Sequence, residues 1–125
     1  MMTDKIYTIE EIKEKIQPLI TKYRLKKVSL FGSYARGEAT EKSDIDLYII
    51  DSPDSYDGIP WAIGAIFCDF EDALDKNVDI VTAKSLRRNW DMWSTRMLFK
   101  NIKKDEVILY ERRTPERYER TGTYD

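Results

Sequence analysis

The sequence predicts a small α/β fold of the α+β type, with a mixed β-sheet and helices packed on one of its faces. Its 125 residues are enough for one domain with one hydrophobic core. Segments with helical periodicity alternate along the chain with short apolar runs that are typical of strands. The order is helix, strand, turn, strand, helix, strand, helix, strand. Such an order leaves the second face of the sheet free for a binding site.

The first helix is expected to begin at Thr8 and to reach Tyr23. Thr8 and Glu11 have the spacing of a capping box, in which each side chain binds the backbone N–H of the other residue. Pro18 is expected to kink this helix or to shift its boundary. The helical spacing is carried by Ile9, Ile12, Ile16, Leu19, Ile20 and Tyr23.

Two strands enclose a turn in the next segment. Residues 28–31 form a short apolar run that ends at Gly32. Residues 34–42 are expected to form a turn or a short helix that closes near Gly37. Residues 43–50 alternate well enough for a second strand.

The second half repeats the pattern. A polar loop is expected over 51–58, because it contains Pro53 and Gly58, and a largely buried helix over 59–76 that includes Trp61. A third strand is expected over 78–81, a helix over 85–104 and a fourth strand over 107–110. We therefore expect one domain over 1–111 and a polar C-terminal tail over 112–125 that could be mobile.

Composition excludes several classes of protein. No apolar run approaches the ~20 residues that span a bilayer, and the first residues lack the features of a signal peptide. The single cysteine cannot form an internal disulfide, so a reducing cytoplasm is expected. The chain has no histidine, which removes the usual general base and the usual zinc ligand. Acid–base and metal chemistry therefore fall to carboxylates, which favour Mg²⁺ or Mn²⁺.

Three carboxylates are candidates for that chemistry. Asp44 and Asp46 are two residues apart on an expected strand, so their side chains project from the same face. Adjacent carboxylates repel each other unless a cation or a proton lies between them. Asp79 lies on the next strand between Val78 and Ile80, and it joins the pair if the two strands are neighbours. Three carboxylates can hold two metal ions at a phosphate, and Asp79 is placed to accept a proton from an incoming hydroxyl.

Gly32 and Ser33 follow the first strand and are candidates for phosphate binding. A glycine lets the backbone approach a phosphate closely, and the N–H groups at a helix start can bind its oxygens. Ser33 adds a hydroxyl donor. Arg36 could add a positive charge, or it could form a surface ion pair with Glu38 or Glu41.

With these residues the chain resembles the DNA polymerase β-like nucleotidyltransferases. The signature is Gly32-Ser33, ten further residues and then Asp44-Ile45-Asp46, and the string GSYARGEATEKSDIDLYI is similar to the minimal stand-alone branch, MNT. The resemblance covers about residues 5–110 and implies the nucleotidyltransferase fold. It implies that Gly32 and Ser33 bind the triphosphate of ATP and that Asp44, Asp46 and Asp79 bind Mg²⁺.

The resemblance also implies a partner. Minimal members are commonly antitoxins paired with a helical HEPN ribonuclease toxin, and they are similar to protein adenylyltransferases that place AMP on a toxin tyrosine. Two alternatives stay open: an antitoxin that only binds and masks the toxin, and a transferase acting on a small molecule or an RNA end. Residues 1–83 hold 10 Lys/Arg and 16 Asp/Glu, whereas residues 84–125 hold 11 and 7. The acidic catalytic half argues against nucleic acid as a direct ligand, because RNA binding needs a basic track.

Two further groups of side chains are expected to pack in the core. Cys68, among apolar neighbours, is expected to be a buried and inert thiol. The helix over 85–104 is rich in aromatic and sulfur-containing side chains, for which core packing is expected and a partner surface is the alternative. These side chains are Trp90, Met92, Trp93, Met97, Leu98 and Phe99, with basic neighbours Lys84, Arg87, Arg88 and Arg96.

Overall fold

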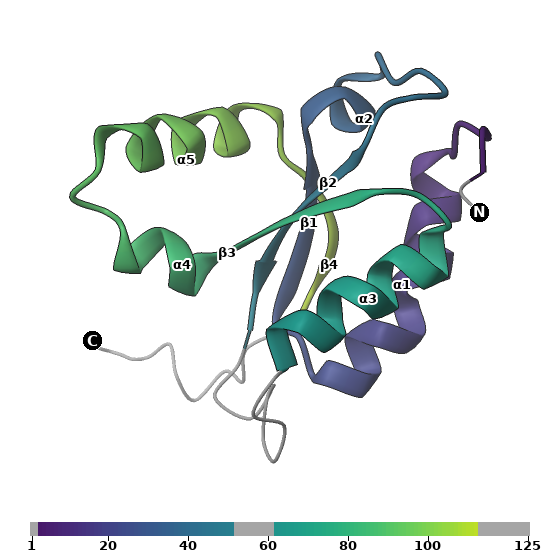
Figure 1. Ribbon diagram of the computed structural model, residues 1–125, viewed down its shortest axis with the longest axis horizontal. Coiled ribbons are helices and arrows are strands. Elements are labelled where there is room, and N and C mark those ends of the chain that lie inside the picture. The colour runs from purple at the N-terminus through teal and green to yellow at the C-terminus, as the bar shows by residue number, and fades with distance from the viewer. Residues whose placement is uncertain (1–2, 52–61, 113–125) are drawn as a thin grey trace.

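A computed structural model describes residues 3–51 and 62–112, and within them four strands form one mixed sheet (Figure 1). The strand order is β3-β2-β1-β4. Strand β1 is antiparallel to both β2 and β4, whereas β2 and β3 are parallel. The bounds are β1 Lys27–Phe31, β2 Ile45–Ile50, β3 Val78–Thr82 and β4 Val107–Glu111. The expected fold class is confirmed, and each expected strand is present within two residues of its expected bounds.

Helices α1 (Ile9–Tyr23) and α3 (Ala62–Leu74) cover one face of the sheet (Figure 1). The capping box of α1 is confirmed, because Glu11 N donates to Thr8 Oγ1 at 3.1 Å and Thr8 N donates to Glu11 Oε1 at 2.8 Å. Pro18 is exposed and stands inside this helix, so it marks no boundary. Burying an aliphatic side chain here contributes about 1.5–3 kcal/mol. The contact is made by Ile12, Ile16, Ile20, Ile66, Phe70 and Leu74 against Val28, Leu30, Ile45, Leu47 and Ile49.

Helices α4 (Ala83–Arg88) and α5 (Trp93–Asp105) lie on the opposite side of the sheet from α1 and α3 (Figure 1). This face was expected to be free of helices, but a second core cluster joins it to α4 and α5. That cluster consists of Phe31, Tyr48, Ala83, Leu86 and Ile102. The second face is therefore partly covered, and only a part of it is left for a site.

The single helix expected over 85–104 is wrong, because the chain turns back between α4 and α5. Asn89 ends α4, and its side-chain Nδ2 donates to the carbonyl of Ser85 at 3.0 Å. The ring of Trp90 then packs edge-on against Phe99, with ring centroids 5.6 Å apart. A tertiary contact between aromatic rings thus favours a turn where the apolar spacing predicts a continuous helix.

Two other expected elements differ in their ends. The short helix α2 covers Gly32–Arg36 and closes at Gly37, which has a left-handed φ of 76°. Helix α3 stops at Leu74, because Asp75 has a φ of 53° and leaves the helical conformation. The loop expected over 51–58, apart from Asp51, lies outside the described residues. So do Trp61 and all of the expected tail except Arg112.

Cys68 corrects a further expectation, because its side chain is exposed. The buried residues of α3 are Ile66, Phe70 and Leu74, which recur every four residues along one side of the helix. Cys68 lies two residues from Ile66 and from Phe70, and a two-residue step on a helix points to the opposite side. Within the described segments, we find no helix with the length and apolar character needed to cross a bilayer.

Candidate active site

Asp46 and Asp79 are direct neighbours on adjacent strands. The parallel pairing of β2 with β3 sets Asp46 opposite Asp79, and Leu47 opposite Ile80. Because side chains alternate along a strand, the burial of Ile45 and Leu47 against α1 and α3 directs Asp46 to the other face. The expected adjacency of the second and third strands is therefore confirmed, and it brings two carboxylates together.

Asp44 lies immediately before β2, which begins at Ile45 and not at residue 43. Asp44 and Asp79 are exposed, whereas Asp46 is half-buried. The three acids thus form a gradient from open solvent to the sheet surface, with Asp46 as the innermost group.

Gly32 lies against the carboxylate of Asp46. The last residue of β1, Phe31, pairs with Asp46 across the sheet, and Gly32 follows with a φ of 75°. A Cβ atom at Gly32 would overlap Oδ2 of Asp46 and would lie 3.1 Å from its Cγ. Only glycine combines this backbone conformation with that lack of volume. Gly32 is expected from the sequence to bind a phosphate, and the fold shows that its lack of a side chain also leaves room for the Asp46 carboxylate.

The environment of Asp46 disfavours its charge. Burial raises the pKa of Asp46 to about 6, and the negative charges of Asp79 and Asp44 add to the effect. The positive charge of Arg36 acts in the opposite direction. A carboxylate that is half-buried beside two other carboxylates is stabilised either by taking up a proton or by binding a cation.

Helix α2 begins beside these acids. Gly32 is its first residue and Ser33 its second, directly after the strand residue that pairs with Asp46. The N–H groups in the first turn of a helix have no carbonyl partner within the helix. The fold therefore brings Gly32 and Ser33 to the same place as the carboxylates, although they are more than ten residues apart in the sequence.

Arg36 is held in ion pairs at the end of α2. Its Nε atom lies 3.0 Å from Glu38 Oε1, and its Nη1 atom lies 2.8 Å from Asp105 Oδ2. A surface ion pair with Glu38 or Glu41 is one of the two roles that the sequence predicts for Arg36, the other being a phosphate contact, and the pair with Glu38 is present. The pair with Asp105 joins α2 to the end of α5 and has no signal in the sequence, because 69 positions separate its partners.

The acids do not by themselves form a closed metal centre. Among residues 3–51 and 62–112, no three His, Cys, Asp or Glu side chains stand together as a group that could hold a metal ion. The donor set nevertheless suits a hard cation, since carboxylate oxygens are the ligands that Mg²⁺ takes in proteins. Burial disfavours the charge on Asp46 and raises its pKa, so a cation beside this carboxylate would favour its ionised form.

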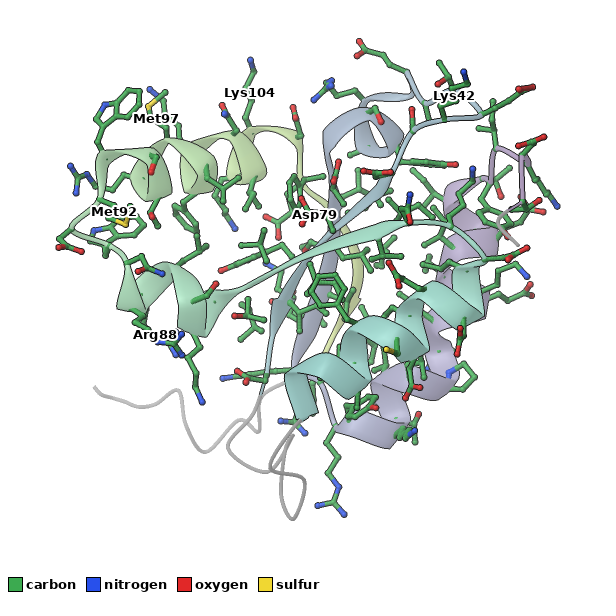
Figure 2. All side chains as sticks on the ribbon, in the orientation of Figure 1. Lys42, Asp79, Arg88, Met92, Met97 and Lys104 are labelled. Carbon is green, nitrogen blue, oxygen red and sulfur yellow. The ribbon has the colours of Figure 1, made fainter. Side chains whose placement is uncertain are left out.

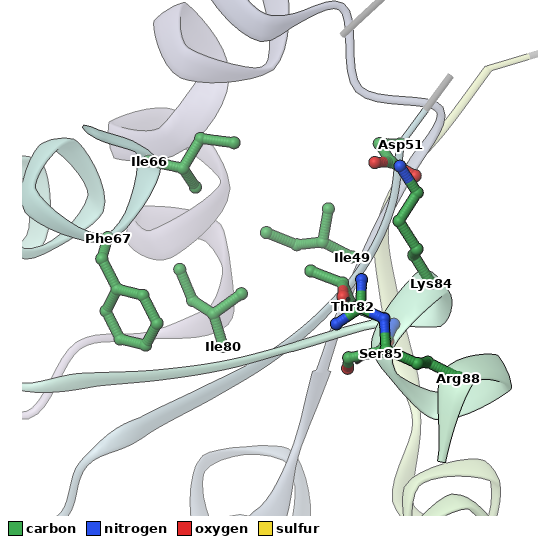
Figure 3. A pocket seen from close by; sticks show the side chains of 9 residues that line it. All are labelled: Ile49, Asp51, Ile66, Phe67, Ile80, Thr82, Lys84, Ser85 and Arg88. Atoms are coloured by element: carbon green, nitrogen blue, oxygen red, sulfur yellow. Dashed lines mark hydrogen bonds between the residues drawn. The ribbon is translucent and has the colours of Figure 1, made fainter. Parts of the chain in front are cut away.

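A hollow of about 310 Å³ lies between α3 and α4 (Figure 3). It is lined by Ile49, Ile66 and Ile80, which belong to or pack on the core beneath α1 and α3, and by Phe67 of α3. The other lining residues are Asp51, Thr82, Lys84, Ser85 and Arg88, the last three of them on α4. This hollow is lined by Ile49 and Ile80, which project from the face of the sheet opposite to Asp46 and Asp79 because side chains alternate along a strand. It is therefore not part of the acidic site.

The aromatic and sulfur-containing side chains near α5 are largely exposed. The prediction that they pack in the core is therefore wrong for most of them. Trp93 is 71% exposed and Met92 is 51% exposed, whereas Phe99 is partly buried against Tyr48. Met92 and Met97 lie at the outer end of α5, away from Asp79 (Figure 2). The exposed apolar set is Trp90, Met92, Trp93, Met97 and Leu98.

Comparison with known proteins gives a family match over most of the chain. Residues 14–114 match the family model described as Polymerase beta, Nucleotidyltransferase. A protein of Methanocaldococcus jannaschii with the name "putative protein adenylyltransferase" is 40% identical over 83 residues, which are 63% of this chain and 82% of that protein. A second protein of that organism and name is 34% identical over 95 residues, which are 68% of this chain and 100% of its own length.

Solved structures show the same similarity. A chain from a crystal structure of a toxin–antitoxin with AMP-PNP superposes with a TM-score of 0.59 at 27% identity, covering 81% of this chain and 74% of that one. A chain from a mutant of the toxin–antitoxin MntA-HpeT gives a TM-score of 0.56 at 25% identity, covering 86% and 76%.

Proposed function

We propose that this chain, which belongs to the Polymerase beta nucleotidyltransferase family and is a nucleotidyltransferase, is an antitoxin that transfers AMP from Mg-ATP to a tyrosine hydroxyl of a HEPN ribonuclease toxin. The transfer inactivates the toxin. One observation carries the proposal: Asp46 and Asp79 are paired across β2 and β3, and Gly32 at the start of α2 lies against Asp46. The names of the relatives and the toxin–antitoxin structures support the acceptor and the partner.

Gly32 and Ser33 bind the triphosphate in this proposal. The N–H groups in the first turn of a helix have no carbonyl partner within the helix and can bind an anion, and the Ser33 hydroxyl adds a donor. Arg36 can add a charge to a phosphate only by giving up its contacts with Glu38 or Asp105. Its role is therefore secondary to that of the glycine and the serine.

Asp44, Asp46 and Asp79 would hold Mg²⁺, as two ions, with Mn²⁺ as a substitute. Bound there, the ions would supply positive charge to the phosphates and lower the cost of the charge on Asp46. The acceptor oxygen forms a bond to the α-phosphorus while the bond from that phosphorus to pyrophosphate breaks. Asp79, which is exposed on β3, accepts the proton of the hydroxyl.

A protein acceptor is supported by the exposed apolar side chains of Met92, Trp93 and Met97, of which Trp93 and Met97 are one helical turn apart on α5. Large exposed apolar side chains that lie together are typical of interaction surfaces, and Trp and Met are enriched in them. Arg88, Arg96 and Lys100 on α4 and α5 are exposed and favour an acidic partner surface. A reducing cytoplasm, where toxin and antitoxin would meet, is part of the proposal.

The test is to incubate the protein with Mg-ATP and the HEPN-type protein encoded beside it, and then to measure the intact mass of that partner. A gain of one or more AMP masses is expected, and Asp46→Asn should abolish it. Asp72→Asn is a matched control, because Asp72 is an exposed acid on α3 at the other face. No gain with a stable complex would replace the proposal with a binding antitoxin. No gain and no complex would favour a small-molecule or RNA-end acceptor.

A further inference from the structure

We infer that the groove between α4 and α5 binds the nucleobase of the nucleoside triphosphate whose phosphates lie at Gly32. The inference rests on the proposed nucleotidyl transfer and adds to it the part of the site that recognises the base. The groove has a volume of about 530 Å³, within the range of ~300–1,000 Å³ that is usual for small-molecule sites. It is lined by Tyr48, Ala83, Leu86, Arg87, Trp90 and Phe99.

The groove begins next to the acids and on their face of the sheet. Tyr48 follows Asp46 by two residues on β2, so the two side chains share a face and their backbones are roughly 7 Å apart. Beyond Asp79, strand β3 leads at Thr82 directly into α4, which forms one wall. A nucleotide with its phosphates at the start of α2 and its α-phosphorus near Asp46 can therefore place its base between α4 and α5.

The lining suits a flat aromatic ring. Tyr48 and Trp90 both pack edge-on against Phe99, with ring centroids 6.3 Å and 5.6 Å apart, so Phe99 fixes the orientation of both rings. Trp90 is 44% exposed, which leaves part of the indole accessible from the groove mouth. Stacking on an aromatic side chain binds any base through its face. The Arg87 guanidinium, which is also on the lining, can donate to acceptor atoms on the edge of a base.

The other hollow of comparable character is excluded by its position. It lies between α3 and α4, and it is lined by Ile49 and Ile80, which project from the face of the sheet opposite to the acids (Figure 3). A base bound there could not belong to a nucleotide that reaches Asp46.

The experiment measures binding by calorimetry with Mg²⁺ and two probes. One is α,β-methylene-ATP, which has a base and cannot transfer AMP, and the other is inorganic tripolyphosphate, which has no base. In Trp90→Leu the affinity for the nucleotide should fall roughly tenfold or more, while tripolyphosphate binds as in wild type. Trp90→Phe keeps an aromatic face and should recover most of the affinity. Ile108→Ala, on the far edge strand β4, removes an exposed apolar side chain elsewhere and serves as the control.

Each outcome decides the inference. An unchanged affinity of Trp90→Leu for α,β-methylene-ATP would overturn the base site and leave nucleotidyl transfer intact. An equal loss for both probes would show that Trp90 supports the fold and not the base, which also overturns the inference. If wild type binds neither probe while remaining folded, the proposed function fails together with the base site.

Discussion

Gly32 and the Asp46 carboxylate are packed so closely that a Cβ atom at residue 32 would overlap Oδ2 of Asp46. The glycine belongs to the segment that begins α2, and the acid belongs to β2, so this contact joins the expected phosphate site to the expected metal site. We expect Gly32→Ala to abolish nucleotidyl transfer, because it displaces the innermost carboxylate. It should also lower the free energy of unfolding by about 1–3 kcal/mol, from backbone strain and overlap.

Gly37→Ala is the matched comparison for that variant. Gly37 has almost the same φ of 76°, but nothing lies within 4 Å of its Cβ position. It should show only the backbone cost of about 1 kcal/mol in chemical denaturation and retain transfer activity. Equal activities of the two alanine variants would show that the packing of Gly32 on Asp46 is not required.

Asp46→Asn should stabilise the metal-free protein at pH 8 while abolishing transfer. The folded pKa of Asp46 is raised to about 6 from an ordinary 3.8, so its ionisation costs folding free energy above that range. The gain should be about 1–2 kcal/mol at pH 8, allowing for solvent around the half-buried group, and it should fade as the pH falls from 6 to 4. Denaturation of both proteins in EDTA across this pH range measures it. A gain that grows toward low pH would contradict the assignment.

Addition of Mg²⁺ should make the wild type more stable than Asp46→Asn. A cation held by Asp44, Asp46 and Asp79 binds only the folded state, so it should raise the Tm of the wild type with increasing concentration. Asp46→Asn should show a much smaller shift. The same shift in both proteins would place the ion elsewhere.

Glu106 should make the fold sensitive to acid. Burial raises the pKa of Glu106, but hydrogen bonds from Lys103, Ser29 and Lys27 outweigh it and lower the pKa to about 2. The side chains of Glu106 and Lys27 are only 7% and 11% exposed, and Lys27 Nζ lies 2.9 Å from Glu106 Oε2. The stabilisation is fully present above the unfolded pKa of about 4.5 and is lost as the pH falls toward 2.

Glu106→Gln should therefore lower the free energy of unfolding at pH 7 by up to about 3 kcal/mol, with the difference from wild type shrinking below pH 4. Lys103→Gln, at the more exposed partner, should cost less than 1 kcal/mol. A pH-independent difference between Glu106→Gln and wild type would refute the electrostatic origin.

Trp93→Ser should separate partner binding from catalysis. The side chain is 71% exposed, so its loss should leave the Tm and the nucleotide affinity unchanged. If the exposed surface near α5 docks the acceptor protein, transfer to that protein should fall severalfold or more through a higher KM. Ile108→Ser, also exposed, should have no effect on transfer.

Most of the strands and helices follow from signals in the sequence, and the site residues predicted from it lie close together in the fold. The capping box of α1, the strand of alternating apolar residues after Asp44 and the glycine at the end of β1 act locally, so their signals lie within a few positions. That locality is why Gly32, Ser33, Asp44, Asp46 and Asp79 could be named as candidates before any fold was known.

Only the tertiary structure decided where side chains without a local signal lie. Cys68 and Trp93 have apolar neighbours in sequence, yet both are exposed, because the side of a helix that is buried depends on what packs against it. The turn between α4 and α5 depends on Trp90 meeting Phe99, and the Arg36 contact with Asp105 joins residues 69 positions apart. Contacts between distant segments are set by the packing of the whole chain. They therefore produce no periodicity or spacing in the sequence from which they could be predicted.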